Sequence, residues 1–106
     1  MFLARVTGHV VATQKDKTLS GQKLFVVEPL NVKYDGDSKP ASLGNTGRAI
    51  VAIDVVGAGQ GQLVLIVQGS SARMTDVTKN LPADAVIVGI VDSAQFGGKT
   101  IYQVQK

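Results

Sequence analysis

Hydrophobic and polar side chains alternate along the first segment of the chain, FLARVTGHVVAT, residues 2–13. Phe2, Ala4 and Val6 fall on one side of an extended chain, whereas Arg5 and the other polar side chains fall on the opposite side. A period of two residues is typical of a β-strand with one buried face. The pattern therefore predicts a half-buried first strand.

The remaining apolar runs are short, rich in Val, Ile and Leu, and bounded by Gly, Pro, Asp or Asn. This composition predicts β-strands separated by turns. The predicted strands are KLFVVEPL (residues 23–30), RAIVAIDVV (48–56), QLVLIVQ (62–68), DAVIVGIVD (84–92) and KTIYQVQ (99–105). Because proline has no N–H to donate, Pro29 is expected to limit pairing toward the end of the second strand.

Polar and glycine-rich segments join these strands. Residues 14–22 form a polar connection. The segment NVKYDGDSKPASLGNTG, residues 31–47, follows neither a strand nor a helix period and predicts a long exposed loop. GAGQG (57–61) and FGG (96–98) predict tight turns between antiparallel strands, where glycine tolerates a positive φ.

One segment, SSARMTDVTKN (residues 70–80), is expected to be helical over a turn or two. Ser70 or Ser71 could cap its start by accepting a backbone N–H bond. Five or six short strands with glycine turns are typical of a small barrel or sandwich. Because the 106 residues contain no repeat and no linker, we predict a single all-β domain, residues 1–106.

The amount and distribution of charge favour a protein partner over a nucleic acid. Charged residues make up 18% of the chain, below the roughly 25% usual for soluble proteins, which leaves room for a subunit interface. The net charge is +3, but the basic residues are scattered from Arg5 to Lys106 without a dense block. Because nucleic-acid binders usually gather their basic residues in a patch, the charge gives little support to such a partner.

The chain contains no cysteine, which fits a reducing compartment. Arg5 and His9 interrupt the apolar residues that a secretion signal would need near the start. AVIVGIV, residues 85–91, is far too short to span a bilayer. We therefore expect a cytoplasmic protein with no membrane partner.

Two glycine-rich segments imitate phosphate-binding motifs. A dinucleotide fingerprint could begin at Gly57 and Gly59, but its third glycine position holds Gln62. GGKT, residues 97–100, lacks the earlier glycine of a P-loop, because that position holds Ser93. A strand is predicted after both segments, so no helix N-terminus is available to bind phosphate. Both are interpreted as turns.

GSSAR, residues 69–73, resembles the nucleophile elbow G-x-S-x-G, but Arg73 replaces its last glycine. His9 is the only histidine that could activate a serine, and no spacing supports a triad of Ser71, His9 and Asp54. One histidine and dispersed carboxylates also give no recognised metal-ligand spacing. We expect no catalytic residue, no metal and no cofactor. A hydrolase that uses Ser71 remains a third, less supported interpretation.

Asp54 lies inside the apolar segment VAIDVV, and burying a lone carboxylate is costly. One interpretation gives it, or Asp84 or Asp92, an ion pair with Arg73, within a subunit or across a boundary. The other leaves all four charges in water. The sequence leaves both interpretations open.

Several segments together resemble a known family. ARVTGHVVATQKD, KLFVVEPL, VAIDVVGAGQGQLVLIVQGSSAR and PADAVIVGIVD resemble, in this order, segments of the EutN/CcmL family of bacterial microcompartment vertex proteins. The similarity runs from about Leu3 to the end of the chain, and many relatives carry an acidic residue where this chain has Gln62. The resemblance implies an OB-like β-barrel of five to six strands with a short helical turn, assembled as a cyclic homopentamer.

The resemblance also implies a geometric role. A sheet of hexagonal shell tiles cannot close without five-fold units, so each pentamer would sit at a vertex, next to hexameric shell proteins in the cytoplasm. In a ring each subunit presents two different surfaces to its neighbours. The residues that this resemblance places at or near the subunit contact are Gly57, Gly59, Gly61, Asp54, Ser70, Ser71 and Arg73.

An alternative interpretation is an OB-like single-stranded nucleic-acid-binding protein. Such a protein stacks bases on aromatic side chains along a basic groove. Phe25 is expected in the core and Tyr34 in the long loop, which leaves few aromatic side chains for stacking. Binding of an oligonucleotide that weakens with salt would favour this alternative.

Overall fold

The structure is a computed structural model that describes residues 1–13, 17–37, 39–79 and 84–104. Residues 14–16 of the predicted polar connection, Asn80 of the predicted helix and Gln105 of the predicted last strand lie outside this range. The elements in chain order are β1 (Phe2–Val10), the 3-10 helix η1 (Lys17–Leu19), β2 (Lys23–Tyr34), β3 (Pro40–Asn45), β4 (Ile50–Asp54), β5 (Leu63–Gln68), the 3-10 helix η2 (Gly69–Arg73), β6 (Ala85–Ile90), β7 (Ser93–Phe96) and β8 (Lys99–Gln103).

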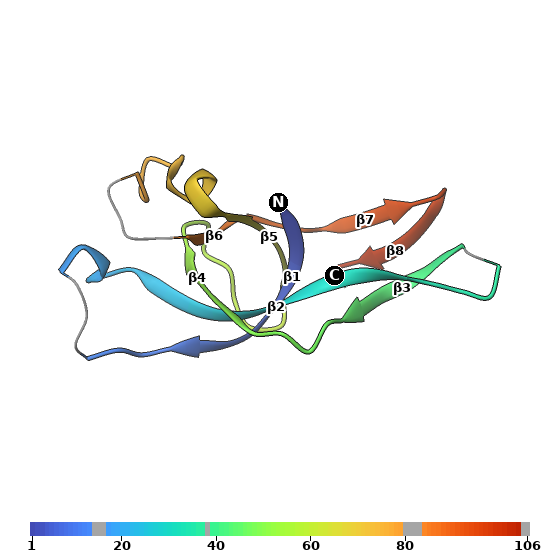
Figure 1. Cartoon of the computed structure of the whole chain (residues 1–106), viewed down its shortest axis with the longest axis horizontal. Coiled ribbons are helices and arrows are strands. Elements are labelled where there is room, and N and C mark those ends of the chain that lie inside the picture. Colours follow the sequence, from blue (N-terminus) through green and yellow to red (C-terminus); the bar gives the residue numbers. More distant parts are fainter. Residues whose placement is uncertain (14–16, 38, 80–83, 105–106) are drawn as a thin grey trace.

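Five strands close into a barrel in the order β1-β5-β6-β4-β2, and β2 pairs back onto β1 (Figure 1). β4 and β6 are parallel, with Ile53 opposite Val86, and the other pairs of the barrel are antiparallel. β3 extends the sheet beyond β2. The prediction of an all-β, OB-like barrel of five to six strands is confirmed.

The barrel interior is filled by small and branched side chains, as expected for a barrel of this size. The alternation in β1 puts Ala4 and Val6 in the interior, where both are buried. Phe25 on β2 is half-buried and packs against this core, as predicted. The buried members of the core are Ala4, Val6, Val27, Ala52, Ala58, Val64, Ile66, Ala85 and Ile87.

A second apolar cluster lies on the outside of the barrel. Ile53 of β4, Val86 of β6 and Ala72 of η2 are buried there together. η2 therefore covers the outer face of the parallel strand pair. This cover explains why β6 reads as a continuous apolar run, since a strand that is buried on both faces does not alternate.

The prediction of a long exposed loop over residues 31–47 is wrong. β2 continues through Pro29 to Tyr34, and β3 folds back on it with Leu30 opposite Asn45. The Asp35 carboxylate holds the turn, because its Oδ1 atom accepts bonds from the N–H groups of Asp37 and Lys39. This hairpin projects from the barrel (Figure 1), so neither face needs the apolar alternation that signals a strand.

Pro29 does not end the pairing of β2, because it lies opposite Ala4 of β1 and its carbonyl oxygen accepts a 2.7 Å bond from the Thr46 hydroxyl. The strand β7 was also not predicted. The sequence does predict the turn that follows β7. In this turn, between antiparallel β7 and β8, Gly97 and Gly98 both have positive φ.

The predicted helix is reduced to the five residues of η2. Its N-cap residue is Gln68, which makes no side-chain capping bond, so Ser70 and Ser71 do not cap it. The hydroxyl that accepts a backbone N–H bond belongs to Thr75 instead, with Thr78 N–H as its donor at 3.0 Å. Thr78 is fully buried, and its own hydroxyl donates to the Ala72 carbonyl at 2.6 Å.

Candidate functional site

The segment after β4 is organised by the Asp54 carboxylate. Its Oδ1 atom accepts a bond from Val56 N–H at 3.1 Å, and its Oδ2 atom accepts bonds from Gly57 N–H at 3.1 Å and Ala58 N–H at 3.0 Å. Asp54 is only 8% exposed. The burial excludes the solvated interpretation for Asp54, and backbone amides, rather than Arg73, are the partners that the structure records for its carboxylate.

The three glycines singled out in the sequence have different roles in the glycine-rich loop, residues 56–62. Gly57 and Gly61 have φ of 82° and 87°, a left-handed conformation that side chains with a Cβ rarely adopt. Gly59 is not in this region, and its N–H donates a 2.7 Å bond to Oε1 of Gln62. Gln62 therefore supplies the acceptor for the Gly59 amide.

The glycine-rich loop is not a hairpin turn, which corrects the prediction. β4 and β5 are not neighbours, and the loop crosses from β4 to the side of β1. There Gly61 N–H donates to the Val6 carbonyl at 2.8 Å and Val6 N–H donates to the Gln62 carbonyl at 3.0 Å. The Arg5 guanidinium adds a 3.0 Å bond to the Gly61 carbonyl.

These bonds also test whether the glycine-rich loop could bind phosphate as a dinucleotide fingerprint does. An anion cradle needs backbone N–H groups that point toward the ligand. In the glycine-rich loop the amides of Val56, Gly57 and Ala58 already donate to a carboxylate, and those of Gly59 and Gly61 donate to a side chain and a carbonyl. The structure therefore agrees with the rejection of the dinucleotide fingerprint at Gly57 and Gly59.

Ser70, Ser71 and Arg73 belong to a different segment from the glycine-rich loop. They belong to η2, which follows the last residue of β5, whereas the loop precedes its first. In the sequence the six residues of β5 separate the two groups, although Ile53 and Val55, on either side of Asp54, pack in the same cluster as Ala72 of η2. The predicted glycines thus precede β5 in the chain, and Ser70, Ser71 and Arg73 follow it.

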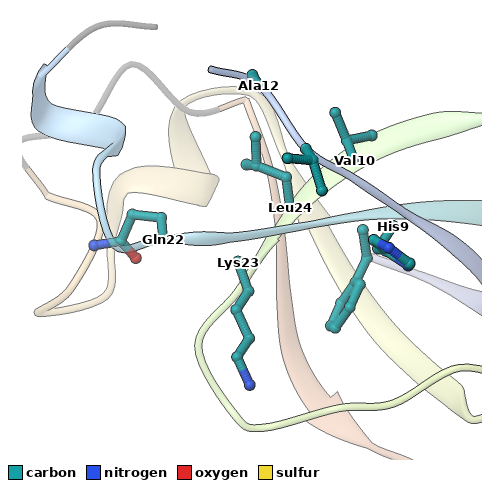
Figure 2. A pocket seen from close by; sticks show the side chains of 8 residues that line it. His9, Val10, Ala12, Gln22, Lys23 and Leu24 are labelled. Carbon is teal, nitrogen blue, oxygen red and sulfur yellow. The ribbon is translucent and has the colours of Figure 1, made fainter. Parts of the chain in front are cut away.

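A hollow of about 400 Å³ lies beside the end of β1 and the beginning of β2 (Figure 2). His9, Gln22 and Lys23 supply its polar side chains, and the other lining residues are Val10, Val11, Ala12, Leu24 and Phe25. Neither Ser71 nor Asp54 lines it, and Asp54 is engaged elsewhere. The structure does not assemble the triad of Ser71, His9 and Asp54.

The described ranges contain no group of three or more His, Asp or Glu side chains that could hold a metal ion. Within the same ranges no helix is both long and apolar enough to cross a membrane. Asp84 and Asp92 are exposed beside β6, and pairing of either with Arg73 stays a prediction.

Two aromatic contacts were not foreseen. Tyr34 at the end of β2 meets Phe96 of β7 edge to face, with ring centroids 6.2 Å apart. The Arg5 guanidinium lies 6.0 Å from the ring centroid of Tyr102 on β8. Both contacts join β7 and β8 to the rest of the chain, and no local sequence signal pairs residues so far apart.

Comparison with known proteins places this barrel in a family. Residues 1–92 match the family described as ethanolamine utilisation protein EutN/carboxysome. The chain belongs to the EutN/CcmL family. The matched range ends at Asp92, immediately before β7 of this family member.

Relatives match over most of the chain. The bacterial microcompartment shell vertex protein PduN of Salmonella typhimurium is 50% identical over 93 residues, which cover 88% of this chain and 97% of PduN. The structure of CcmL from Nostoc sp. PCC 7120 superposes with a TM-score of 0.81 at 35% identity, over 98% of this chain and 100% of that one. The GrpN pentameric microcompartment shell protein from Rhodospirillum rubrum gives a TM-score of 0.65 at 38% identity, over 91% and 98%. The resemblance inferred from the sequence is confirmed.

Proposed function

We propose that this EutN/CcmL family member is a structural shell protein whose homopentamers cap the five-fold vertices of a bacterial microcompartment. The observation that carries the proposal is family membership over nearly the whole chain, among relatives named shell vertex proteins and a solved relative described as pentameric. The proposal makes the protein non-enzymatic, cytoplasmic, and a partner of hexameric shell proteins rather than of nucleic acid or membranes.

The geometry of the predicted site residues supports a ring. A cyclic assembly needs two different surfaces on each subunit, because the front of one copy meets the back of the next. The glycine-rich loop precedes β5 in the chain and η2 follows it, so each segment is assigned here to one of the two surfaces. Gly57, Gly59 and Gly61 would then belong to one contact and Ser70, Ser71 and Arg73 to the other, while Asp54 holds the loop in shape.

Exposed apolar side chains agree with an assembling surface. Val51 of β4, Ile90 of β6 and Val56 all remain at least 39% exposed. Val56 belongs to the glycine-rich loop. Burial of such side chains between subunits gains roughly 25 cal/mol per Å² of apolar surface.

Shell closure tests the proposal directly. Hexameric shell tiles are assembled in vitro with and without the purified protein, and the products are imaged by electron microscopy. We expect closed polyhedral shells only when the protein is present, with one protein pentamer at each vertex. Open sheets or tubes in both samples would overturn the proposal.

A further inference from the structure

A projecting part of the chain has almost no hydrophobic core of its own. We call this part the arm: Leu30–Tyr34 at the outer end of β2 and the strand β3, together with β7 and β8. Every buried hydrophobic side chain of the described residues lies between Ala4 and Val27 or between Ala52 and Ile87. The arm contains none of them.

The arm also makes the molecule long. The principal extents are 51 × 27 × 23 Å, and the radius of gyration is 15.0 Å. A compact domain of this length has a radius of gyration of about 13 Å. Figure 1 shows the β2–β3 and β7–β8 hairpins reaching out together on one side of the barrel.

Each half of the arm is only a two-stranded ribbon. Beyond Pro29, β2 pairs with β3 alone, and among the described strands β7 and β8 pair only with each other. An isolated two-stranded ribbon is marginally stable in water at best. β3 and β8 lie near each other, and the Tyr34–Phe96 contact adds one aromatic pair.

That aromatic pair is still open to solvent. Tyr34 is 55% exposed and Phe96 is 46% exposed, so much of their surface remains available for a further contact. Aromatic side chains are enriched where protein interfaces gain most of their binding energy. A structure that projects, lacks a core and presents two aromatic rings fits a surface that is completed by another protein.

We propose that the arm is a subunit contact, in which Tyr34 and Phe96 pack against the next copy of this chain. This inference rests on the proposed homopentamer. A second copy is the occupant that the observations favour, because solved relatives are described as pentameric shell proteins and each copy in a ring must reach its neighbour. The contact also uses β7, which lies beyond the matched family range.

Matched variants test the contact. The double variant Tyr34→Ser/Phe96→Ser removes both rings, and Val11→Ser removes a side chain that is 82% exposed and lies outside the arm, the glycine-rich loop and η2. Native mass is measured over a dilution series. We expect the double variant to need at least about tenfold more protein for half-assembly, since loss of two interface aromatics typically costs that much or more. The Val11→Ser variant should assemble as the parent chain does.

A cross-linking experiment answers the same question in a chain that keeps both aromatic positions filled. Phe96 is replaced by photoreactive benzoylphenylalanine, and the product is irradiated alone and with hexameric shell tiles. We expect cross-links to a second copy in both samples. Cross-links to the tiles only would overturn this inference, and so would an unchanged half-assembly concentration in the double variant. In either case the proposed function stands as long as the parent chain forms a pentamer. A monomeric parent chain would overturn both.

Discussion

The Asp54 carboxylate is the group whose removal should most disturb the glycine-rich loop. It accepts three backbone N–H bonds from within a largely buried position. In Asp54→Ala, the buried Ala58 N–H loses its acceptor, whereas the amides of Val56 and Gly57 can turn partly to water. A buried donor without a partner costs about 1–3 kcal/mol, and a bond to a charged group contributes about 1.5–3 kcal/mol. We expect a loss of about 3 kcal/mol in the free energy of unfolding.

The Asp54→Asn variant removes the charge and one acceptor oxygen but keeps the shape of the side chain, so it shows how much of the loss in free energy of unfolding comes from the charge and the acceptor. The single amide oxygen of Asn can accept either the Val56 N–H bond or the bonds from Gly57 and Ala58 N–H. Its NH₂ group then takes the place of the other oxygen and faces an N–H group that it cannot accept from. We expect an intermediate loss of about 1–2 kcal/mol. The shape of the side chain is otherwise unchanged.

The assay is urea unfolding at one fixed protein concentration, because the stability of an oligomer depends on concentration. Asp76→Ala is the control, since Asp76 is an exposed carboxylate outside the loop. It should change the free energy of unfolding by less than about 0.5 kcal/mol. A loss below about 1 kcal/mol in Asp54→Ala, or the same loss in its Asn counterpart, would refute the loop-holding role assigned to this carboxylate.

Three further predictions use the same unfolding assay. Gly57→Ala should cost about 1–2 kcal/mol because its φ is positive, whereas Gly59→Ala should stay within about 0.5 kcal/mol, and equal losses would contradict the backbone argument. Gln62→Glu keeps the acceptor for Gly59 N–H and should be near neutral, while Gln62→Ala should lose about 1 kcal/mol; a costly Glu variant would speak against this bond. Thr78→Val removes the buried hydroxyl and should cost about 1–3 kcal/mol, so a neutral result would show that the bond to Ala72 is unimportant.

The barrel strands could be predicted from the sequence because each has a face that must be buried. β1 alternates, and β4, β5 and β6 carry apolar residues on both faces under the cover of η2. β3 and β7 could not be predicted in this way. They belong to the arm, where no face meets the core and the polar residues of a ribbon look like those of a loop.

The role of the candidate site was harder to predict than its position. The sequence leaves open whether Asp54 is solvated or paired with Arg73, whereas the structure buries its carboxylate against backbone amides that any residue type supplies. The crossing of the glycine-rich loop from β4 to β1 depends on the order of strands in the sheet. Local turn chemistry carries no information on that order.

The central claim is that the chain assembles into a closed ring of five. Native mass spectrometry of the purified protein is its most direct test. We predict one dominant species of five copies of 11.1 kDa, about 55 kDa, that persists on dilution into the micromolar range. A dominant 11.1 kDa subunit at every concentration, or a closed assembly of another number of copies, would contradict it.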